Sequence, residues 1–234
     1  MTALLEVERL TRRFGSVRAV DGASLTVADG SITALIGPNG SGKTTLFNLV
    51  TGYLRPNEGR VRFRDRDVTG RGSGRLYADG LTRTFQQARI FPQLTVRENL
   101  TVASGLTWPQ VFGRRHSHHD RRRAGELLDE FGLGHVAELF ASELSYGQRK
   151  LVEFAAVLMS RPSLVLLDEP TAGVNPVMVS AMERHVRDQH AAGVTFLVVE
   201  HDMGFVMRLC DPVVVFDRGH AIFAGAPAEV QTNP

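Results

Sequence analysis

The eight residues from Gly37 to Thr44, Gly-Pro-Asn-Gly-Ser-Gly-Lys-Thr, have the types and spacing that bind phosphate. They fit the phosphate-loop pattern G-x-x-x-x-G-K-[ST]. The apolar run Ile32 to Ile36 before them predicts a buried strand, and residues 44–50 predict a helix that ends near Gly52. A loop in this position directs its backbone N–H groups and the positive end of the helix at an anion. The segment therefore predicts binding of a nucleoside triphosphate.

Each residue type in this loop suits part of that task. The glycines at 37, 40 and 42 let the backbone turn tightly and approach the ligand without a Cβ in the way. Lys43 places a compact positive charge near the β- and γ-phosphates, and the Thr44 hydroxyl is placed to ligate Mg²⁺. The predicted nucleotide-binding residues of this segment are Gly37, Pro38, Asn39, Gly40, Ser41, Gly42, Lys43, Thr44 and Thr45.

Two acids follow a second apolar run, Leu164 to Leu167. Alone, this segment is consistent with a core strand that has a polar exit. Beside a phosphate loop, however, Asp168 is placed to hold Mg²⁺ and Glu169 to polarise the attacking water. Ligands of such sheets bind at the carboxyl ends of the strands, where both acids lie.

A histidine follows the next apolar run, Phe196 to Val199. His201 lies about one βαβ unit after Asp168, so we expect both residues at the same edge of the sheet. A lone histidine is more often structural than catalytic. With the other motifs in place, we predict that His201 contacts the γ-phosphate.

A second helix start begins at Leu144 with the sequence Leu-Ser-Tyr-Gly-Gln. Ser145 and Gln148 have the spacing of a capping box, which needs no ligand. A helix N-terminus that carries a hydroxyl and Gly147 can also bind an anion. Because the phosphate loop already serves one anion, two such helix ends predict a nucleotide bound between two chains.

The rest of the chain predicts how these motifs are positioned. Continuous apolar runs predict central parallel strands, and period-two alternation predicts antiparallel strands at residues 6–8, 25–27 and 60–64. Residues between 87 and 160 are mostly helix-forming, with predicted helices at residues 95–102, 120–131 and 146–159. We therefore predict an α/β fold, a P-loop NTPase core with a mixed sheet and an antiparallel β subdomain, formed by residues 1–86 and 161–234. An α-helical lobe, residues 87–160, is inserted into it.

Composition excludes several classes of protein. The net charge of +2 gives no strong field for nucleic acid. The apolar runs are far shorter than the roughly 20 residues that span a membrane, and the N-terminus lacks a secretory pattern. We therefore expect a protein that stays in the cytosol. The basic run at residues 114–123 includes three histidines without a Cys or acidic ligand set, so we interpret it as a solvated loop and helix start rather than a metal or lipid-headgroup site.

Five motifs together resemble the ATP-binding cassette ATPases in order and spacing, over essentially the whole chain. They are the phosphate loop, Gln86 after a predicted strand at residues 81–85, Leu-Ser-x-Gly-Gln, Leu-Leu-Asp-Glu-Pro and Glu-His-Asp. The chain looks most like the branched-chain amino-acid importer group, through residues 84–86, 144–148, 172–176 and 199–203.

The resemblance implies tasks for further residues. Phe14, otherwise an apolar residue at a strand end, would stack on adenine. Gln86 would sense Mg²⁺ and the attacking water, which makes it a candidate catalytic residue and metal ligand. Residues 91–95 would receive a membrane subunit, although Thr95 also begins a plain capping box. The helix start with Ser145, Gly147 and Gln148 would bind the γ-phosphate held by the opposite subunit.

Two residues depart from the general cassette pattern. Tyr146 replaces the first glycine of Leu-Ser-Gly-Gly-Gln, which adds a ring at the expected dimer seam. Asn175 stands where an aspartate is usual, which removes a charge from the segment between the two sites. Both resemble the branched-chain group.

The resemblance implies an ATPase subunit that uses ATP and Mg²⁺ and dimerises head to tail with an identical or sister subunit. Its catalytic residues would be Glu169, His201 and Gln86, and its metal ligands Thr44, Gln86 and Asp168. It would lie peripherally at the cytoplasmic side of the membrane. There it would bind integral permease subunits and act indirectly with an external solute-binding protein. Its ATP hydrolysis would power uptake of branched-chain or hydrophobic amino acids or a related small solute.

Other phosphate-loop classes fit less well. A GTPase would need an Asn-Lys-x-Asp motif, which is absent because lysine occurs only at positions 43 and 150. We expect no nucleic-acid partner, because the segment between Gln86 and Ser145 is too short for long heptad arms. A non-transport ATPase of the same superfamily, acting as a regulatory or nucleic-acid-associated switch, is the alternative.

Overall fold

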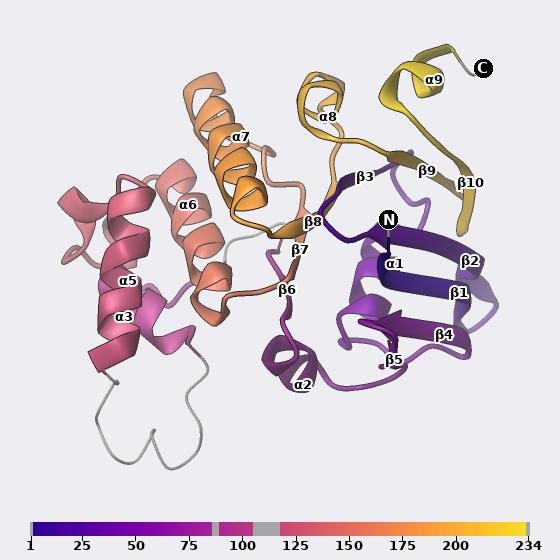
Figure 1. The fold of residues 1–234 in the computed structure, drawn as a ribbon, viewed down its shortest axis with the longest axis horizontal. Helices are drawn as coiled ribbons and strands as arrows, with labels where there is room; N and C mark the ends of the chain where they lie inside the picture. The colour runs from indigo at the N-terminus through magenta and orange to yellow at the C-terminus, as the bar shows by residue number, and fades with distance from the viewer. Residues whose placement is uncertain (1, 86–88, 105–117, 233–234) are drawn as a thin grey trace.

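A computed structural model of the chain describes residues 2–85, 89–104 and 118–232 (Figure 1). Its strands are β1 (Ala3–Phe14), β2 (Val17–Ala28), β3 (Ile32–Ile36), β4 (Glu58–Phe63), β5 (Arg66–Asp67), β6 (Leu81–Arg83), β7 (Leu164–Asp168), β8 (Thr195–Val199), β9 (Val213–Asp217) and β10 (His220–Gly225). Its α-helices are α1 (Lys43–Val50), α2 (Ser73–Ala78), α3 (Val96–Val102), α5 (His118–Glu130), α6 (Tyr146–Val157), α7 (Pro176–Ala191), α8 (Met203–Leu209) and α9 (Pro227–Thr232). The predictions about Gln86 and about residues 114–117 lie outside the described residues.

The larger sheet has six strands in the order β10-β9-β3-β8-β7-β6. Its strands pair in parallel except for β10, which is antiparallel to β9. Every residue of β3, β7 and β8 is buried, as their continuous apolar runs predict. Because neighbouring parallel strands end at one edge, the residues that follow β3, β7 and β8 are brought together there.

The smaller sheet is antiparallel, with the order β2-β1-β4-β5, and confirms the predicted β subdomain (Figure 1). β1 and β2 have twelve residues each, much more than the predicted triplets, because irregularities in the register interrupt their alternation between Val7 and Leu10. β4 ends at Phe63 rather than at residue 64, because Arg64 and Asp65 adopt left-handed conformations in the turn to β5.

Helices connect the parallel strands, as predicted for βαβ units. α7 links β7 to β8, and α8 links β8 to β9. β6 ends at Arg83, two residues before the predicted end of that strand. The N–H of Thr84 then donates to the carbonyl of Leu166 on β7. No helix in the described part of the chain is both long and apolar enough to cross a membrane.

α3, α5 and α6 form the helical lobe, beyond β6 and on the opposite side of the molecule from the antiparallel sheet (Figure 1). α5 begins at His118 and ends at Glu130, one or two residues earlier than predicted, and α6 tightens into a 3-10 turn after Val157. A chain of rings joins the lobe to the sheet. Phe154 of α6 meets Phe131 at 5.4 Å and Phe196 of β8 at 6.2 Å. The division into a core of residues 1–86 and 161–234 and a lobe of residues 87–160 stays a prediction.

A buried histidine lies where α7 meets the lobe. His185 is 1% exposed, and neither of its ring nitrogens has a hydrogen-bond partner among the described residues. Its ring stacks on Phe131 with the centroids 4.1 Å apart. Burial lowers the pKa of His185, and Arg184 lowers it further. The folded protein therefore favours the neutral imidazole.

This histidine predicts a loss of stability in acid. Because its pKa is lower in the folded than in the unfolded chain, its contribution is present above about pH 6.5 and falls as the pH drops below it. We expect the free energy of unfolding, measured with urea at about pH 7.5 and about pH 5.5, to fall less for His185→Phe than for the unchanged protein. His119→Phe, at an exposed histidine of α5, is the control and should behave as the unchanged protein does. An equal acid loss in all three proteins would contradict the assignment.

Candidate nucleotide-hydrolysis site

The predicted phosphate loop connects β3 to α1 through a backbone that only glycine can follow. Gly37, Gly40 and Gly42 all have positive φ, at 151°, 80° and 107°. A Cβ on Gly37 would lie 1.9 Å from the carbonyl oxygen of Phe216, and one on Gly42 would lie 2.2 Å from that of Ala19. The loop thus packs closely against β9 and β2, so Gly37 and Gly42 are required by packing as well as by any ligand.

Lys43, the first residue of α1, is 5% exposed and lies across the loop. Its ammonium group donates to the carbonyl oxygens of Gly37 at 2.8 Å and Pro38 at 2.9 Å. Burial lowers the pKa of Lys43, while Glu169 and Asp168 oppose that shift. The Lys43 ammonium group is therefore stabilised by two backbone carbonyls and by the negative charge of two acids.

A cavity of about 190 Å³ lies beside the loop. Its lining comes from the loop, from α1, from β2 and from the exit of β7, and consists of Ala19, Asn39, Gly40, Gly42, Lys43, Thr44, Thr45 and Glu169. Ser41 is 3% exposed and its hydroxyl has no hydrogen-bond partner among the described residues. A buried hydroxyl without a partner, next to a lysine and a helix N-terminus, is a feature that an anion would satisfy.

The two acids predicted from sequence lie at the end of β7. Asp168 is the last residue of the strand, and Glu169 follows it with a left-handed φ of 48°. Such a conformation is strained for a residue with a Cβ and turns the chain sharply. The Glu169 carboxylate lies 3.0 Å from Nε2 of His201, so the structure brings these two predicted residues together. It also brings Glu169 into the cavity beside Lys43.

A third acid, Glu200, holds this arrangement in place and was not predicted from sequence. It is 2% exposed. One carboxylate oxygen accepts bonds from the N–H of Thr171 at 2.8 Å and from its hydroxyl at 2.6 Å. The other accepts from the N–H groups of His201 at 2.8 Å and Asp202 at 3.2 Å. Glu200 thus ties the exit of β7 to the exit of β8.

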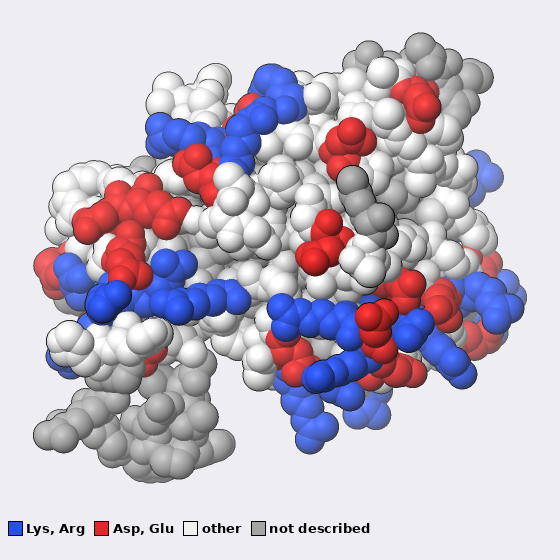
Figure 2. All heavy atoms as spheres, in the orientation of Figure 1, with Lys and Arg blue, Asp and Glu red and all other residues white. Residues whose placement is uncertain are grey.

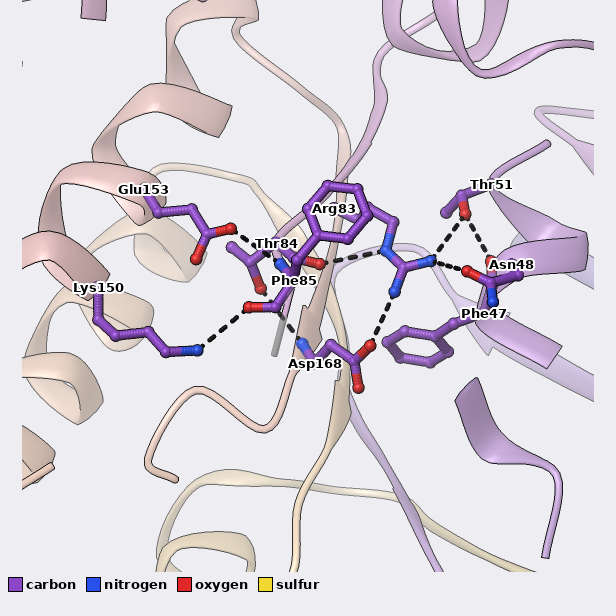
Figure 3. A network of polar contacts seen from close by, with 9 residues as sticks. All are labelled: Phe47, Asn48, Thr51, Arg83, Thr84, Phe85, Lys150, Glu153 and Asp168. Carbon is purple, nitrogen blue, oxygen red and sulfur yellow. Dashed lines mark hydrogen bonds and ion pairs between the residues drawn. The ribbon is translucent and has the colours of Figure 1, made fainter. Parts of the chain in front are cut away.

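Asp168 has a charged partner that sequence reasoning also missed. Arg83 of β6 lies 2.7 Å from its carboxylate, and both side chains are 4% exposed (Figure 3). Burial raises the pKa of Asp168, and Arg83 opposes that shift. An arginine inside the predicted strand at residues 81–85 was the available signal, because buried arginines are almost always paired.

Side chains of the helical lobe form hydrogen bonds with the main chain of Phe85, immediately before Gln86 in the sequence. The N–H of Phe85 donates to Glu153 of α6 at 3.0 Å, and the Phe85 carbonyl accepts from Lys150 at 3.1 Å (Figure 3). Burial raises the pKa of Glu153 to about 7, although the Phe85 N–H and the Lys150 ammonium act to lower it. Gln86 itself is outside the described residues, but the residue before it is fastened to α6.

The start of α6 combines both interpretations made from sequence. Ser145 and Gln148 form the predicted capping box, with bonds of 2.9 and 3.3 Å. A Cβ on Gly147 would lie 2.9 Å from the Met178 side chain, so this glycine also serves packing against α7. Ser145 is exposed on the surface. The cavity beside the phosphate loop is lined by other residues, so within one chain the structure does not bring the two predicted anion sites together.

The two departures from the general cassette pattern each have a structural counterpart. The Tyr146 ring packs over Gly173, where an added Cβ would lie 3.3 Å from the ring. The side chain of Asn175 accepts a bond from the Met178 N–H at 2.9 Å and so begins α7. The Tyr146 ring thus packs on a glycine, which has no side chain to obstruct it. The Asn175 amide caps α7 as an aspartate carboxylate also would.

Phe14 lies at the end of β1 and pairs with Val17 across the hairpin. Its ring is 45% exposed, with the guanidinium of Arg12 4.8 Å from the ring centroid. Ala19, two residues beyond Val17, lines the cavity of the phosphate loop. The hairpin that carries the exposed ring therefore also forms one wall of the cavity.

Sequence comparison assigns these features to one family. The ABC transporter family model matches residues 20–172. The chain is 37% identical over 244 residues to the high-affinity branched-chain amino acid transport ATP-binding protein BraF of Pseudomonas aeruginosa, covering 99% of this chain and 94% of that protein. It is 36% identical over 244 residues to the protein LivG of the same description from Escherichia coli K12, with the same coverage.

Solved structures agree with the sequence comparison. A nucleotide-free ATP-binding cassette from an ABC transporter matches with a TM-score of 0.91 at 35% identity, covering 100% of this chain and 96% of that one. The ADP conformation of an ATP-binding cassette of an ABC transporter matches with a TM-score of 0.90 at the same identity and coverage. The chain belongs to the ABC transporter family and is one of its ATPases.

Proposed function

We propose that this chain is the Mg²⁺-dependent ATP-hydrolysing subunit of an importer for branched-chain or hydrophobic amino acids or a related small solute. The observation that carries the chemistry is that Lys43 and Glu169 line one cavity, with His201 bonded to Glu169. The transport assignment is supported by BraF and LivG, the branched-chain amino acid transport proteins to which the chain is similar over almost their whole length. The subunit would lie at the cytoplasmic side of the membrane.

In this proposal the phosphates bind at the start of α1. Backbone N–H groups, the Lys43 ammonium and the Ser41 hydroxyl would hold the oxygens, and the exposed Phe14 ring would stack on the base. Binding would give the Ser41 hydroxyl a partner, which it does not have among the described residues. Lys43 would exchange its two carbonyl contacts for phosphate oxygens.

The proposed metal ligands also suit Mg²⁺. They are the Thr44 hydroxyl, the Asp168 carboxylate acting through a water molecule, and the amide oxygen of Gln86, and all are the hard oxygen donors that Mg²⁺ prefers. When bound, Mg²⁺ would neutralise charge on the β- and γ-phosphates. Glu169 would polarise the attacking water, and His201 would contact the γ-phosphate from the next strand end.

A second ATPase subunit would complete each site. The start of α6, with Ser145, Gly147 and Gln148, is proposed to bind the γ-phosphate held by the other subunit in a head-to-tail dimer. The exposure of Ser145, together with its separation from the cavity of its own chain, supports a ligand on another molecule. That subunit is a second copy or a sister chain.

An apolar surface on the lobe is proposed to receive the permease. Residues 91–97 and 137–142 are joined by backbone hydrogen bonds of 2.9 to 3.1 Å. They carry three large exposed apolar side chains, Phe91 at 54%, Leu139 at 42% and Phe140 at 51%. Such side chains on neighbouring segments are typical of a protein interaction site. Phe91, Leu139 and Phe140 are therefore the residues proposed to contact the permease.

Charge on the molecule gives the nucleic-acid alternative no support. Figure 2 shows acidic and basic side chains interspersed over the face in view, and the net charge is only +2. A nucleic-acid switch would need a continuous basic stripe. The transporter proposal therefore fits the observed charge better.

The catalytic part is tested by Glu169→Gln, which keeps the size of the side chain and removes the base. Hydrolysis should fall about 10²–10⁴-fold, while affinity for ATP remains and a dimer accumulates. Phosphate release, binding of a fluorescent ATP analogue and size-exclusion chromatography measure the three properties. Glu138→Gln, at an exposed carboxylate paired with Arg97, is the control and should hydrolyse ATP normally. Undiminished turnover in Glu169→Gln would refute the proposed base.

The transport part is tested by affinity purification from solubilised membranes. We expect integral membrane subunits to be recovered with the unchanged chain, and much less of them with the double variant Phe91→Asp, Phe140→Asp, because charge is costly in an apolar interface. Ile222→Asp changes a side chain that is 63% exposed on β10 and should leave recovery unchanged. Thermal melting confirms that each variant is folded. Absence of membrane subunits with the unchanged chain would count against any transporter.

A further inference from the structure

Arg83 is the most buried arginine of the site and has a place in none of the motifs. It is the last residue of β6 and is 7% exposed. In Figure 3 its guanidinium group lies between Asp168 at the end of β7 and two polar side chains of the α1 region, Asn48 and Thr51. An arginine so enclosed must have every donor satisfied, or its burial is costly.

The guanidinium group reaches three separate parts of the chain. One terminal nitrogen, Nη2, donates to Oδ2 of Asp168 at 2.7 Å. The other, Nη1, donates to Oδ1 of Asn48 at 2.6 Å and to the Thr51 hydroxyl at 3.4 Å. The third, Nε, donates to the carbonyl of Thr84 at 3.1 Å. The group therefore cross-links the strand ends of β6 and β7 to the end of α1.

Aromatic rings fix the plane of this fork. The guanidinium carbon lies 4.6 Å from the centroid of the Phe85 ring, 5.6 Å from Tyr53 and 5.8 Å from Phe47. Tyr53 and Phe85 also contact each other edge to face, at 5.4 Å. These three rings restrict the rotation of the Arg83 guanidinium group, so its bond to Asp168 has a defined direction.

The direction of that bond determines how Asp168 faces the cavity. Arg83 engages Oδ2, and Figure 3 shows the other carboxylate oxygen pointing away from the guanidinium group. The same fork is anchored to α1, whose first two residues are Lys43 and Thr44. A movement of α1 relative to β7 would therefore change the contacts of Arg83 with Asn48 or Asp168.

We propose that Arg83 is a positioning residue for the metal site, because it orients the Asp168 carboxylate and fixes its distance from the helix that carries Lys43 and Thr44. The inference rests on the proposed Mg²⁺-dependent function. Arg83 is enclosed by protein groups, so it acts through Asp168 and does not touch the nucleotide. Its task requires arginine, because the single nitrogen of a lysine cannot replace the three separate nitrogens that bind Asp168, Asn48 and Thr84.

A merely structural ion pair makes a different prediction. Loss of such a pair lowers stability but leaves the Mg²⁺ dependence of nucleotide binding unchanged. Loss of a group that orients a metal ligand weakens metal binding about 10–100-fold. The Mg²⁺ concentration at half-saturation therefore separates the two, when measured by binding of a fluorescent ATP analogue during Mg²⁺ titration from an EDTA-treated sample.

We expect Arg83→Gln to raise that half-saturating concentration about 10–100-fold while affinity for the analogue in EDTA stays close to that of the unchanged protein. Arg83→Lys should give an intermediate rise. Asn48→Leu removes one arm of the fork and leaves the Asp168 bond, so it should shift the value in the same direction by a smaller factor. It also tests the inference if the Arg83 variants do not fold.

Leu81→Ala is the matched control. Leu81 is 2% exposed on the same strand, and its truncation should lower the melting temperature without moving the Mg²⁺ half-saturation. If every folded variant of Arg83 and Asn48 keeps the normal half-saturation, the inference is wrong and the proposed function stands. If the unchanged protein shows no gain in affinity with Mg²⁺, the proposed function and the inference fail together.

Discussion

Burial of β3, β7 and β8 on both faces leaves the chain one place for its polar chemistry, the sheet edge at which these strands end. Every residue of the three strands is enclosed, so no functional side chain projects from their faces into solvent. The phosphate loop, Glu169 and His201 lie just beyond the ends of these strands, and Asp168 is the last residue of β7. Parallel alignment then gathers residues that lie far apart in sequence. The site is thus a consequence of how the core is buried.

Gathering charge at a partly buried edge has a cost that the chain offsets by pairing. Lys43 is held by two backbone carbonyls, Asp168 by Arg83, and Glu200 by four donors from the exits of β7 and β8. Such networks are stable only when all their members are satisfied. Within the loop, the Ser41 hydroxyl has no partner in the described part of the chain, and it lies where the phosphates are proposed to bind. The unpaired hydroxyl therefore lies at the proposed phosphate-binding position.

The helical lobe is connected to this edge by specific contacts. Glu153 and Lys150 bind the two polar groups of the Phe85 main chain, and the Tyr146 ring lies over Gly173 after β7. The lobe thus contacts the residues on either side of the strand edge through α6. A movement of α6 would be felt both before Gln86 and after Glu169. α6 therefore connects the lobe to the main chain on both sides of the proposed nucleotide site.

Sequence patterns predicted the strands, the loop and the acids because these depend on local order along the chain. The continuous run before Asp168 and the glycine spacing before Lys43 are each complete within a few residues. The partners of buried charges were not predicted, because Arg83 and Asp168 lie on neighbouring strands that are 85 residues apart in sequence. Periodicity indicates that a residue is buried but not what it meets. The lengths of β1 and β2 were missed for a related reason, since irregular register breaks the alternation on which the prediction relied.

A crystal structure of the Glu169→Gln variant with ATP and Mg²⁺ would test the account most directly. The account predicts that the triphosphate lies on the loop from Gly37 to Thr44, with the Lys43 ammonium moved from the carbonyls of Gly37 and Pro38 to phosphate oxygens. It also predicts a bond from the Ser41 hydroxyl to phosphate, and Ser145 of another subunit at the γ-phosphate. A nucleotide bound elsewhere, or Lys43 still held by both carbonyls beside a bound triphosphate, would contradict it.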